Sequence, residues 1–235
     1  MRRFWNWVRD GDADRTLYFD GVIAEETWFQ DDITPETFRA ELMGGDGPVT
    51  IFLNSPGGCC FAASQIYTML MEYPHDVTIK IDGIAASAAS VIAMAGTRVL
   101  MAPTALLMIH NPLSHVMGDT AEMRKAIHML EEVKDSILNA YEIKTGLPRD
   151  EISRMMDAET WISAGRAVEL GFADGMLTKG DTTEAQNRAP DVLVGFAFSR
   201  TAATNSLLDK MKLSTLPAKP GTPIADLDKR LALLL

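Results

Sequence analysis

The stretch VTIFLNSPGG at residues 49–58 decides the fold class, because an apolar strand runs directly into a glycine-containing loop. Residues 49–53 are apolar apart from Thr50, which is typical of a strand in a sheet that is covered on both faces. A helix is expected over residues 62–72, and another short strand over residues 77–81. The order strand, glycine-rich loop, helix and strand predicts an α/β fold built from ββα units.

The long helix expected over residues 120–144 carries apolar side chains at steps of three or four. Its apolar stripe comprises Met123, Ile127, Leu130, Val133, Ile137 and Tyr141. Periodicity, capping residues and turn residues also predict strands over residues 17–23, 98–101 and 105–109, and helices over residues 34–43, 85–94, 149–156 and 163–170. A final strand is expected near residue 176.

The composition is that of a globular protein and disfavours two kinds of partner. Of the 235 residues, 47% are hydrophobic and 23% are charged, and the net charge is −10. Such acidity argues against nucleic-acid binding, because phosphate contacts need clustered Lys and Arg. No apolar stretch follows the charged N-terminus, and the low-charge run over residues 83–97 is too short to span a bilayer. We therefore expect a cytoplasmic protein that does not bind membranes.

The chain is predicted to have three segments, namely an N-terminal extension (residues 1–16), a main domain (residues 17–179) and a C-terminal tail (residues 180–235). Residues 181–235 carry seven basic and six acidic side chains, so the negative charge lies on the main domain. Three prolines within residues 216–223 precede a short amphipathic helix expected over residues 224–235. The tail is interpreted either as a linker with a docking segment or as a disordered tail.

The two cysteines, Cys59 and Cys60, are adjacent and predict neither a disulfide framework nor a metal site. Neighbouring cysteines rarely pair with each other, and no further Cys or His lies at metal-ligand spacing. We interpret them as small, partly buried thiols and expect neither a metal nor a cofactor.

A peptide-bond hydrolase needs a nucleophile, a base, a group that orients the base, and donors for the oxyanion. Ser87 lies where an expected strand gives way to an expected helix, among small residues that would let a substrate come close. His110 ends an apolar strand and precedes Asn111 and Pro112, a good position for a base. Ser90, one helical turn after Ser87, is a fallback nucleophile. Taken singly, each of these side chains is more typical of a structural residue.

Gly57 and Gly58 follow an apolar strand and allow a backbone conformation that points N–H groups into a cleft. Such a pair is compatible with an oxyanion hole and also with a simple tight turn. Both interpretations stay open when this motif is taken by itself.

Together, four motifs in one order resemble the Clp protease proteolytic subunit family, ClpP. They are FLNSPGG at residues 52–58, the run from Gly83 to Ser87, MIHNP at residues 108–112, and the closing segment at residues 161–174. The resemblance covers residues 17–177 and implies a serine endopeptidase. It also implies a ClpP/crotonase-like spiral of ββα units with a projecting handle helix, within the α/β class predicted above.

By this resemblance Ser87 is the nucleophile and His110 is the general base. The N–H groups of Gly58 and Ala88 would form the oxyanion hole, although the family has Met at the position of Ala88. A backbone donor tolerates that change, because the side chain takes no part in it. The resemblance further implies a substrate-binding role for Gly57, Asn111 and Pro112.

The third member of the catalytic triad has two candidates. The family places an Asp two residues before the aromatic residue of its closing motif, and this chain has Glu159 at that position. Several hydrolases orient their catalytic His with a Glu, so we favour Glu159. Asp157, two residues earlier, is the alternative.

The resemblance also bears on partners. In the family, the interval occupied by residues 120–144 forms a handle that interlocks stacked rings, so we expect a homo-oligomeric, heptamer-like ring that acts on protein or peptide substrates. The Trp-rich N-terminal region, residues 25–29 and the long tail resemble phage or prophage head-maturation proteases, which trim capsid and scaffold proteins. We expect that role.

A crotonase-type acyl-CoA enzyme would share the fold but would not explain Ser87 and His110 together. Besides it, three alternatives stay open. The first is a housekeeping ClpP peptidase that works with a Clp ATPase. The second is a catalytically inactive structural capsid subunit. The third is a related peptidase with a Ser–Lys pair, for which Lys80 is the Lys nearest to the expected site in sequence.

Overall fold

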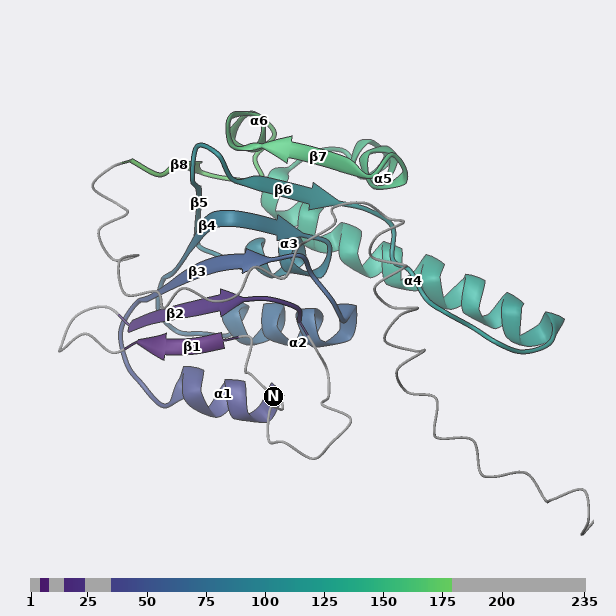
Figure 1. Cartoon of the computed structure of the whole chain (residues 1–235), viewed down its shortest axis with the longest axis horizontal. Coiled ribbons are helices and arrows are strands. Elements are labelled where there is room, and N and C mark those ends of the chain that lie inside the picture. The colour runs from purple at the N-terminus through teal and green to yellow at the C-terminus, as the bar shows by residue number, and fades with distance from the viewer. Residues whose placement is uncertain (1–4, 9–14, 24–34, 179–235) are drawn as a thin grey trace, which may run out of the picture. The chain divides into compact units, whose positions relative to one another are not determined.

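The computed structural model describes residues 5–8, 15–23 and 35–178 (Figure 1). The chain divides into a unit of residues 1–188 and a unit of residues 189–235, and every described residue belongs to the first unit. The tail, its expected helix and the segment at residues 25–29 lie outside the described residues. Among the helices that are described, none is both long and apolar enough to cross a membrane.

The described part of the chain is built on one mixed sheet with the strand order β1-β2-β3-β4-β5-β8, to which β6 and β7 are added as a branch. The neighbours from β2 to β8 are parallel, as is the pair β4 and β6, whereas β1 and β7 pair antiparallel with β2 and β6. The strands are β1 (Trp5–Val8), β2 (Arg15–Asp20), β3 (Val49–Ser55), β4 (Val77–Ala86), β5 (Arg98–Met101), β6 (Leu106–Ile109), β7 (Thr160–Ser163) and β8 (Gly175–Met176).

Strand β4 is the branch point of the sheet. Its first half pairs with β5 as far as Ile81, and its second half pairs with β6 from Ile84 to Ala86. The β3–β4 register shifts between Leu53 and Ser55, where the side chain of Asn54 accepts a hydrogen bond from the backbone N–H of Ile84. The carboxyl ends of β4 and β6 are therefore adjacent at one edge, beyond the carboxyl end of β3.

Helices α1 (Pro35–Met43), α2 (Cys60–Met71) and α3 (Ala88–Ala93) lie together on one face of the sheet (Figure 1). Alternate residues of each strand point to that face, because successive side chains of a strand point to opposite sides. The largest of them are fully buried in the core, namely Leu17, Phe19, Ile51, Leu53, Ile79 and Ile81. This burial explains why the sequence of these strands is apolar.

Helix α4 (Thr120–Thr145) is packed at one end and projects at the other (Figure 1). Ile137, Leu138, Ala140 and Tyr141 near its carboxyl end are buried, whereas Met123 and Ile127 in its first half are 40% and 57% exposed. Asp119 caps its amino end by accepting hydrogen bonds from two backbone N–H groups, and Gly146 ends it in the left-handed conformation. Helices α5 (Arg149–Asp157) and α6 (Ala164–Glu169) follow.

The α/β class and the projecting helix predicted from the sequence are confirmed, but one helix begins later than predicted and one strand was not predicted. Strand β4 continues to Ala86, where a helix over residues 85–94 was expected, because pairing with β6 outweighs the weak local preference of an Ala and Ser run. Strand β7 was not expected at all. The residues assigned to an N-terminal extension supply β1 and the start of β2, with Trp5 buried.

Candidate active site

Ser87 and His110 meet at the carboxyl ends of β4 and β6. Ala86 pairs with Met108 in the parallel register, and the backbone N–H of Ser87 donates to the carbonyl of Met108 at 2.9 Å. The next residues of both strands are thereby held together, and Ser87 Oγ lies 2.8 Å from His110 Nε2. With the ring proton on Nδ1, the serine hydroxyl donates to Nε2, which is the arrangement of a nucleophile beside its base.

The backbone of Ser87 is strained. Its φ of 54° and ψ of −126° lie in a region that residues with a side chain rarely adopt. Such strain costs on the order of 1–3 kcal/mol and is typical of active sites, including the sharp strand-to-helix turn that exposes a nucleophilic serine. The sequence lacks the Gly-x-Ser-x-Gly pattern that usually marks this turn, so the strain was not predicted; the small neighbours Ala86 and Ala88 were its only sign.

Ser90 supports this turn from inside the core. It is fully buried, and its hydroxyl donates to the carbonyl of Ser87 at 2.5 Å and lies 2.7 Å from the hydroxyl of Tyr141 in α4. Because a serine hydroxyl has one proton, Tyr141 is the donor in the second contact. Burial raises the pKa of Tyr141, and the hydrogen bond with Ser90 partly offsets this rise. Ser90 therefore has a structural role, and the fallback assignment as nucleophile is not supported.

Gly57 lies directly against the nucleophile. It has a φ of 96°, and a Cβ atom there would lie 2.7 Å from Ser87 Cβ and 2.9 Å from the backbone nitrogen of Ala88. Contacts this close leave no room for a side chain, so only glycine lets the loop after β3 approach the serine.

The backbone N–H of Gly58 is directed by its neighbours. The N–H of Ile23 donates to the carbonyl of Gly57, and the N–H of Cys59 donates to the carbonyl of Ile23, both at 2.9 Å. Since backbone groups alternate along an extended segment, the N–H of Gly58 points away from Ile23. The first N–H groups of α3, beginning with Ala88, also lack partners within their helix. The N–H groups of Gly58 and Ala88 are therefore the candidate donors at this site.

The two candidate carboxylates occupy different surroundings. Ile109 pairs with Thr160 in the antiparallel register of β6 and β7. If this register is continued by one residue, Glu159 lies opposite His110. Glu159 has a φ of 49°, which is uncommon for a residue with a side chain. Asp157 instead accepts hydrogen bonds from Lys134 Nζ at 2.6 Å and Asn111 Nδ2 at 2.9 Å. The hydrogen bond from Lys134 lowers the pKa of Asp157 most, and that from Asn111 lowers it further.

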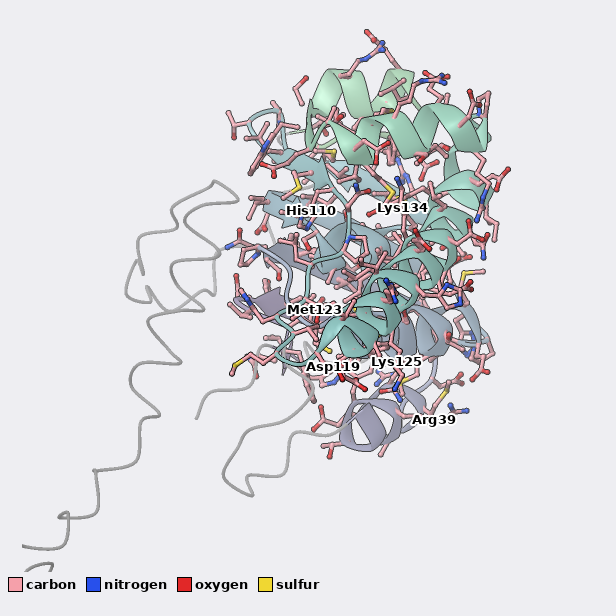
Figure 2. All side chains as sticks on the ribbon, turned by 90° about the vertical axis from the view of Figure 1, so that its right-hand side faces the viewer. Arg39, His110, Asp119, Met123, Lys125 and Lys134 are labelled. Carbon is pink, nitrogen blue, oxygen red and sulfur yellow. The ribbon has the colours of Figure 1, made fainter. Side chains whose placement is uncertain are left out.

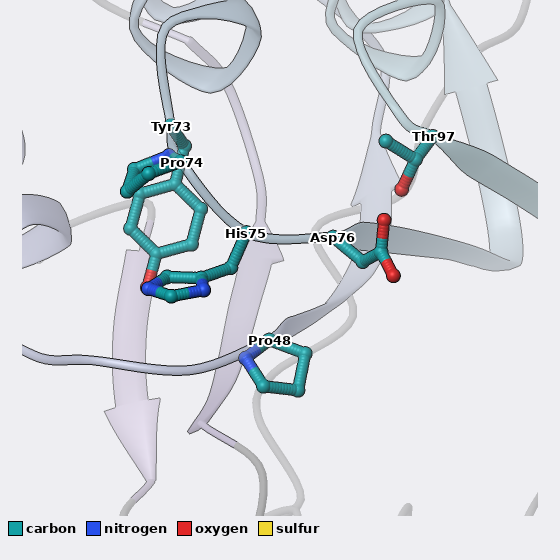
Figure 3. A pocket seen from close by; sticks show the side chains of 6 residues that line it. All are labelled: Pro48, Tyr73, Pro74, His75, Asp76 and Thr97. Carbon is teal, nitrogen blue, oxygen red and sulfur yellow. The ribbon is translucent and has the colours of Figure 1, made fainter.

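Other candidates lie elsewhere in the fold. Lys80 is buried with its Nζ 5.1 Å from the ring centre of Phe52, and it precedes Ser87 by seven residues in an extended strand, a separation of about 20 Å. His75 is paired with Asp46 at 2.5 Å. It lines a pocket of about 460 Å³ at the amino ends of β3 and β4, opposite the end that carries Ser87 (Figure 3).

A family model and individual known proteins show similarity of this chain to the same kind of protein. A model of the family described as Clp protease matches residues 14–180. The ATP-dependent Clp protease proteolytic subunit of Porphyromonas gingivalis is 31% identical over 179 residues, which cover 73% of this chain and 80% of the relative. The ATP-dependent Clp protease proteolytic subunit 2 of Thermobifida fusca is 33% identical over 132 residues, which cover 55% of this chain and 65% of the relative. The corresponding subunit of Bacteroides fragilis is 29% identical over 170 residues, which cover 69% of this chain and 82% of the relative.

The two serines are expected to respond differently to removal of their hydroxyls. Ser87→Ala should abolish covalent labelling by a fluorophosphonate, because the nucleophile is lost while the fold is kept. Ser90→Ala should retain labelling but lower the free energy of unfolding by about 1–3 kcal/mol, because the buried hydroxyl of Tyr141 loses its acceptor. Mass spectrometry of the adduct and denaturant titration measure both effects. Labelling that survives in Ser87→Ala and disappears in Ser90→Ala would reverse the assignment.

Proposed function

The chain belongs to the Clp protease family and is a serine endopeptidase, and we propose that Ser87 and His110 carry out its reaction on the capsid or scaffold proteins of a phage. The observation that carries the site assignment is the 2.8 Å contact between Ser87 Oγ and His110 Nε2 at the ends of two parallel strands. It supports the pair as nucleophile and base because both ends of the contact are fixed by the β4–β6 register.

In the proposed reaction His110 acts first as a base and then as an acid. Nε2 accepts the hydroxyl proton of Ser87 while Oγ bonds to the carbonyl carbon of the scissile peptide. The carbon–nitrogen bond of the tetrahedral intermediate then breaks, and Nε2 returns the proton to the leaving amine. Water, deprotonated by the same nitrogen, attacks the acyl-enzyme and releases the new carboxyl end.

The negative charge of the intermediate is the main quantity to be stabilised. We assign this role to the backbone N–H groups of Gly58 and Ala88, because Gly57 brings the loop after β3 against the residue that bears the nucleophile. A donor fixed in the backbone needs no reorganisation as charge develops, and one such donor typically contributes about 10²–10³ in rate. Asn111 and Pro112, directly after His110, would border the bound substrate.

Glu159 is the proposed third member of the triad. Its position opposite His110, when the β6–β7 register is continued by one residue, supports this choice. Asp157 is the weaker candidate because its carboxylate already accepts hydrogen bonds from Lys134 and Asn111. A carboxylate beside His110 would hold the ring in the tautomer that leaves Nε2 free to accept the proton.

The phage assignment is supported by residues outside the family match. The family model ends at residue 180, and the 55 residues that follow resemble the extensions of head-maturation proteases. The Trp-rich start of the chain points the same way. Because phage capsids assemble in the cytoplasm of the host cell, we propose that the enzyme acts there.

A housekeeping peptidase is the second candidate, since the curated relatives are named ATP-dependent Clp protease proteolytic subunits. That function would require a Clp ATPase as partner and would leave the proposed chemistry unchanged. A catalytically inactive capsid subunit is the third, and labelling of Ser87 would exclude it.

Self-association is proposed through the projecting half of α4. Met123 and Ile127, four residues apart and so on one side of α4, are exposed in the half that extends beyond the sheet (Figure 1). Figure 2 shows Met123 on this half. Apolar side chains in such a position are typical of contact surfaces between subunits. The Clp protease family suggests ring assemblies, and we propose a heptamer-like ring for this chain.

Processing of a phage protein is tested by incubating the enzyme with capsid and scaffold proteins and identifying the released peptides by mass spectrometry. We expect a few defined cleavage sites without ATP or a Clp ATPase, and none with Ser87→Ala. Cleavage of unfolded proteins that appears only when a Clp ATPase and ATP are added would favour the housekeeping role.

The third triad member is tested by Glu159→Gln, which keeps the shape of the side chain and removes its charge. Peptide hydrolysis should fall by roughly 10³–10⁴, because His110 loses the group that fixes its tautomer. Glu169→Gln on α6, an exposed residue paired with Arg166, is the matched control and should hydrolyse at the normal rate. A Glu159→Gln enzyme of full activity would remove Glu159 from the triad.

The handle assignment is tested by introducing charge on the exposed stripe. The double variant Met123→Lys and Ile127→Lys should elute from a sizing column as a smaller species than the wild type, since burying two ammonium groups opposes association. Glu132→Lys, on the opposite side of the same helix, should leave the elution unchanged. A wild-type protein that is monomeric at micromolar concentration would contradict the proposal.

A further inference from the structure

One carboxylate oxygen joins three separate parts of the chain. Asp157, the last residue of α5, accepts hydrogen bonds at the same Oδ1 from Asn111 Nδ2 at 2.9 Å and from Lys134 Nζ at 2.6 Å. Asn111 directly follows His110, and Lys134 lies in α4 (Figure 2). The segment that carries the base is therefore tied by one side chain to two helices.

The contact has a defined geometry and a fixed anchor. A carboxylate accepts but does not donate, so it fixes the amide of Asn111 with its NH₂ group toward Asp157. Lys134 is on the packed half of α4, one turn before the buried residues Ile137 and Leu138. Its side chain is 21% exposed and that of Asp157 is 55% exposed, so the ion pair is partly open to water.

The neighbouring charges do not compete for Asp157. Arg149, at the start of α5, pairs with Asp135 at 2.7 Å and Glu142 at 3.0 Å. Arg154 pairs with Asp150 at 2.7 Å on the same helix. Within the part of the chain that the structure describes, the charged side chains around α5 therefore fall into separate groups, and Lys134 belongs with Asp157.

Protonation of Asp157 would weaken this bridge only in acid. Hydrogen bonds from Lys134 and Asn111 depress the pKa of Asp157 below its ordinary value. A group whose pKa is depressed by folding stabilises the native state above its unfolded pKa, and this stabilisation is lost as the pH falls through the folded value. Assays at neutral pH therefore examine the intact ion pair.

From these contacts we propose that Asp157 and Lys134 are positioning residues for the base, acting through Asn111 on the segment that holds His110. The inference rests on the proposed function, since it assumes that His110 serves Ser87. It gives Asp157 a role different from that of a third triad member, because its carboxylate orients the backbone segment after the base and not the imidazole ring.

Loss of the bridge should affect the chemical step more than substrate binding. Asn111 is adjacent in the chain to His110, whose Nε2 must stay within hydrogen-bond reach of Ser87 Oγ. A displacement of about 1 Å at a reacting group can cost roughly 10² in rate. Asn111 also borders the bound substrate in the proposed function, but the loop after β3 takes no part in this bridge, so KM should change less than kcat.

The test uses the full chain with variants on both sides of the ion pair and a matched control for each. Asp157→Ala is compared with Asp150→Ala on the same helix, and Lys134→Met with Lys125→Met, whose partner Glu122 is exposed on the projecting half of α4. The measurements are kcat and KM for a short peptide and the rate of fluorophosphonate labelling of Ser87. All are made at neutral pH on sizing-column fractions of equal size.

We expect kcat and the labelling rate to fall by about 10–100-fold in Asp157→Ala and Lys134→Met, with KM within about twofold of the wild type. The combined variant should be no slower than either single one, because both remove the same bridge. Lys134→Arg should restore most of the rate, since it keeps the charge. Both control variants should behave as the wild type.

Two results would overturn the inference and leave the assignment of Ser87 as nucleophile and His110 as base standing. One is an Asp157→Ala enzyme that reacts at the wild-type rate. The other is an Asp157→Ala enzyme as inactive as Ser87→Ala, which would make Asp157 the third triad member. Failure of the wild-type protein to be labelled at Ser87 is a different outcome, because it contradicts the proposed function itself.

Discussion

The parallel pairing of β4 with β6 is the constraint on which the site depends. Ala86 opposite Met108 sets the register, and the bond from Ser87 N–H to the carbonyl of Met108 extends it by one residue beyond the strand. A slip of one residue would turn every following side chain to the other face of the sheet. The same register that buries the apolar strand residues therefore also brings a hydroxyl to an imidazole.

Helix α4 contributes to the site from its packed half. Tyr141 donates to Ser90, which holds the carbonyl of the strained Ser87, and Lys134 binds the carboxylate that holds Asn111. One helix is thus linked by hydrogen bonds, through Ser90 and through Asp157, to the segments that carry both reacting residues. Its other half carries the exposed apolar stripe, so the element proposed for assembly is continuous with the element that supports the reaction.

The sequence could predict that Ser87 and His110 lie at one edge of the sheet, because each follows an apolar strand and the ends of parallel strands meet there. Their proposed roles came from the resemblance to the Clp protease family. It could not show the strain at Ser87, since no residue there demands a positive φ. Strand β7 was missed because its pairing with β6 joins residues about 50 positions apart, and local preference does not encode such pairing. For the same reason, spacing alone left both Glu159 and Asp157 open as partners of His110.

The most direct test of the central claim is a crystal structure of the protein with a peptide boronic acid, which forms a tetrahedral adduct with a serine nucleophile. We expect a bond between boron and Ser87 Oγ. We also expect one boronate oxygen within hydrogen-bond distance of the N–H groups of Gly58 and Ala88, and His110 Nε2 beside the adduct. Boron bonded to another residue, or a boronate oxygen directed away from both N–H groups, would contradict the proposed site.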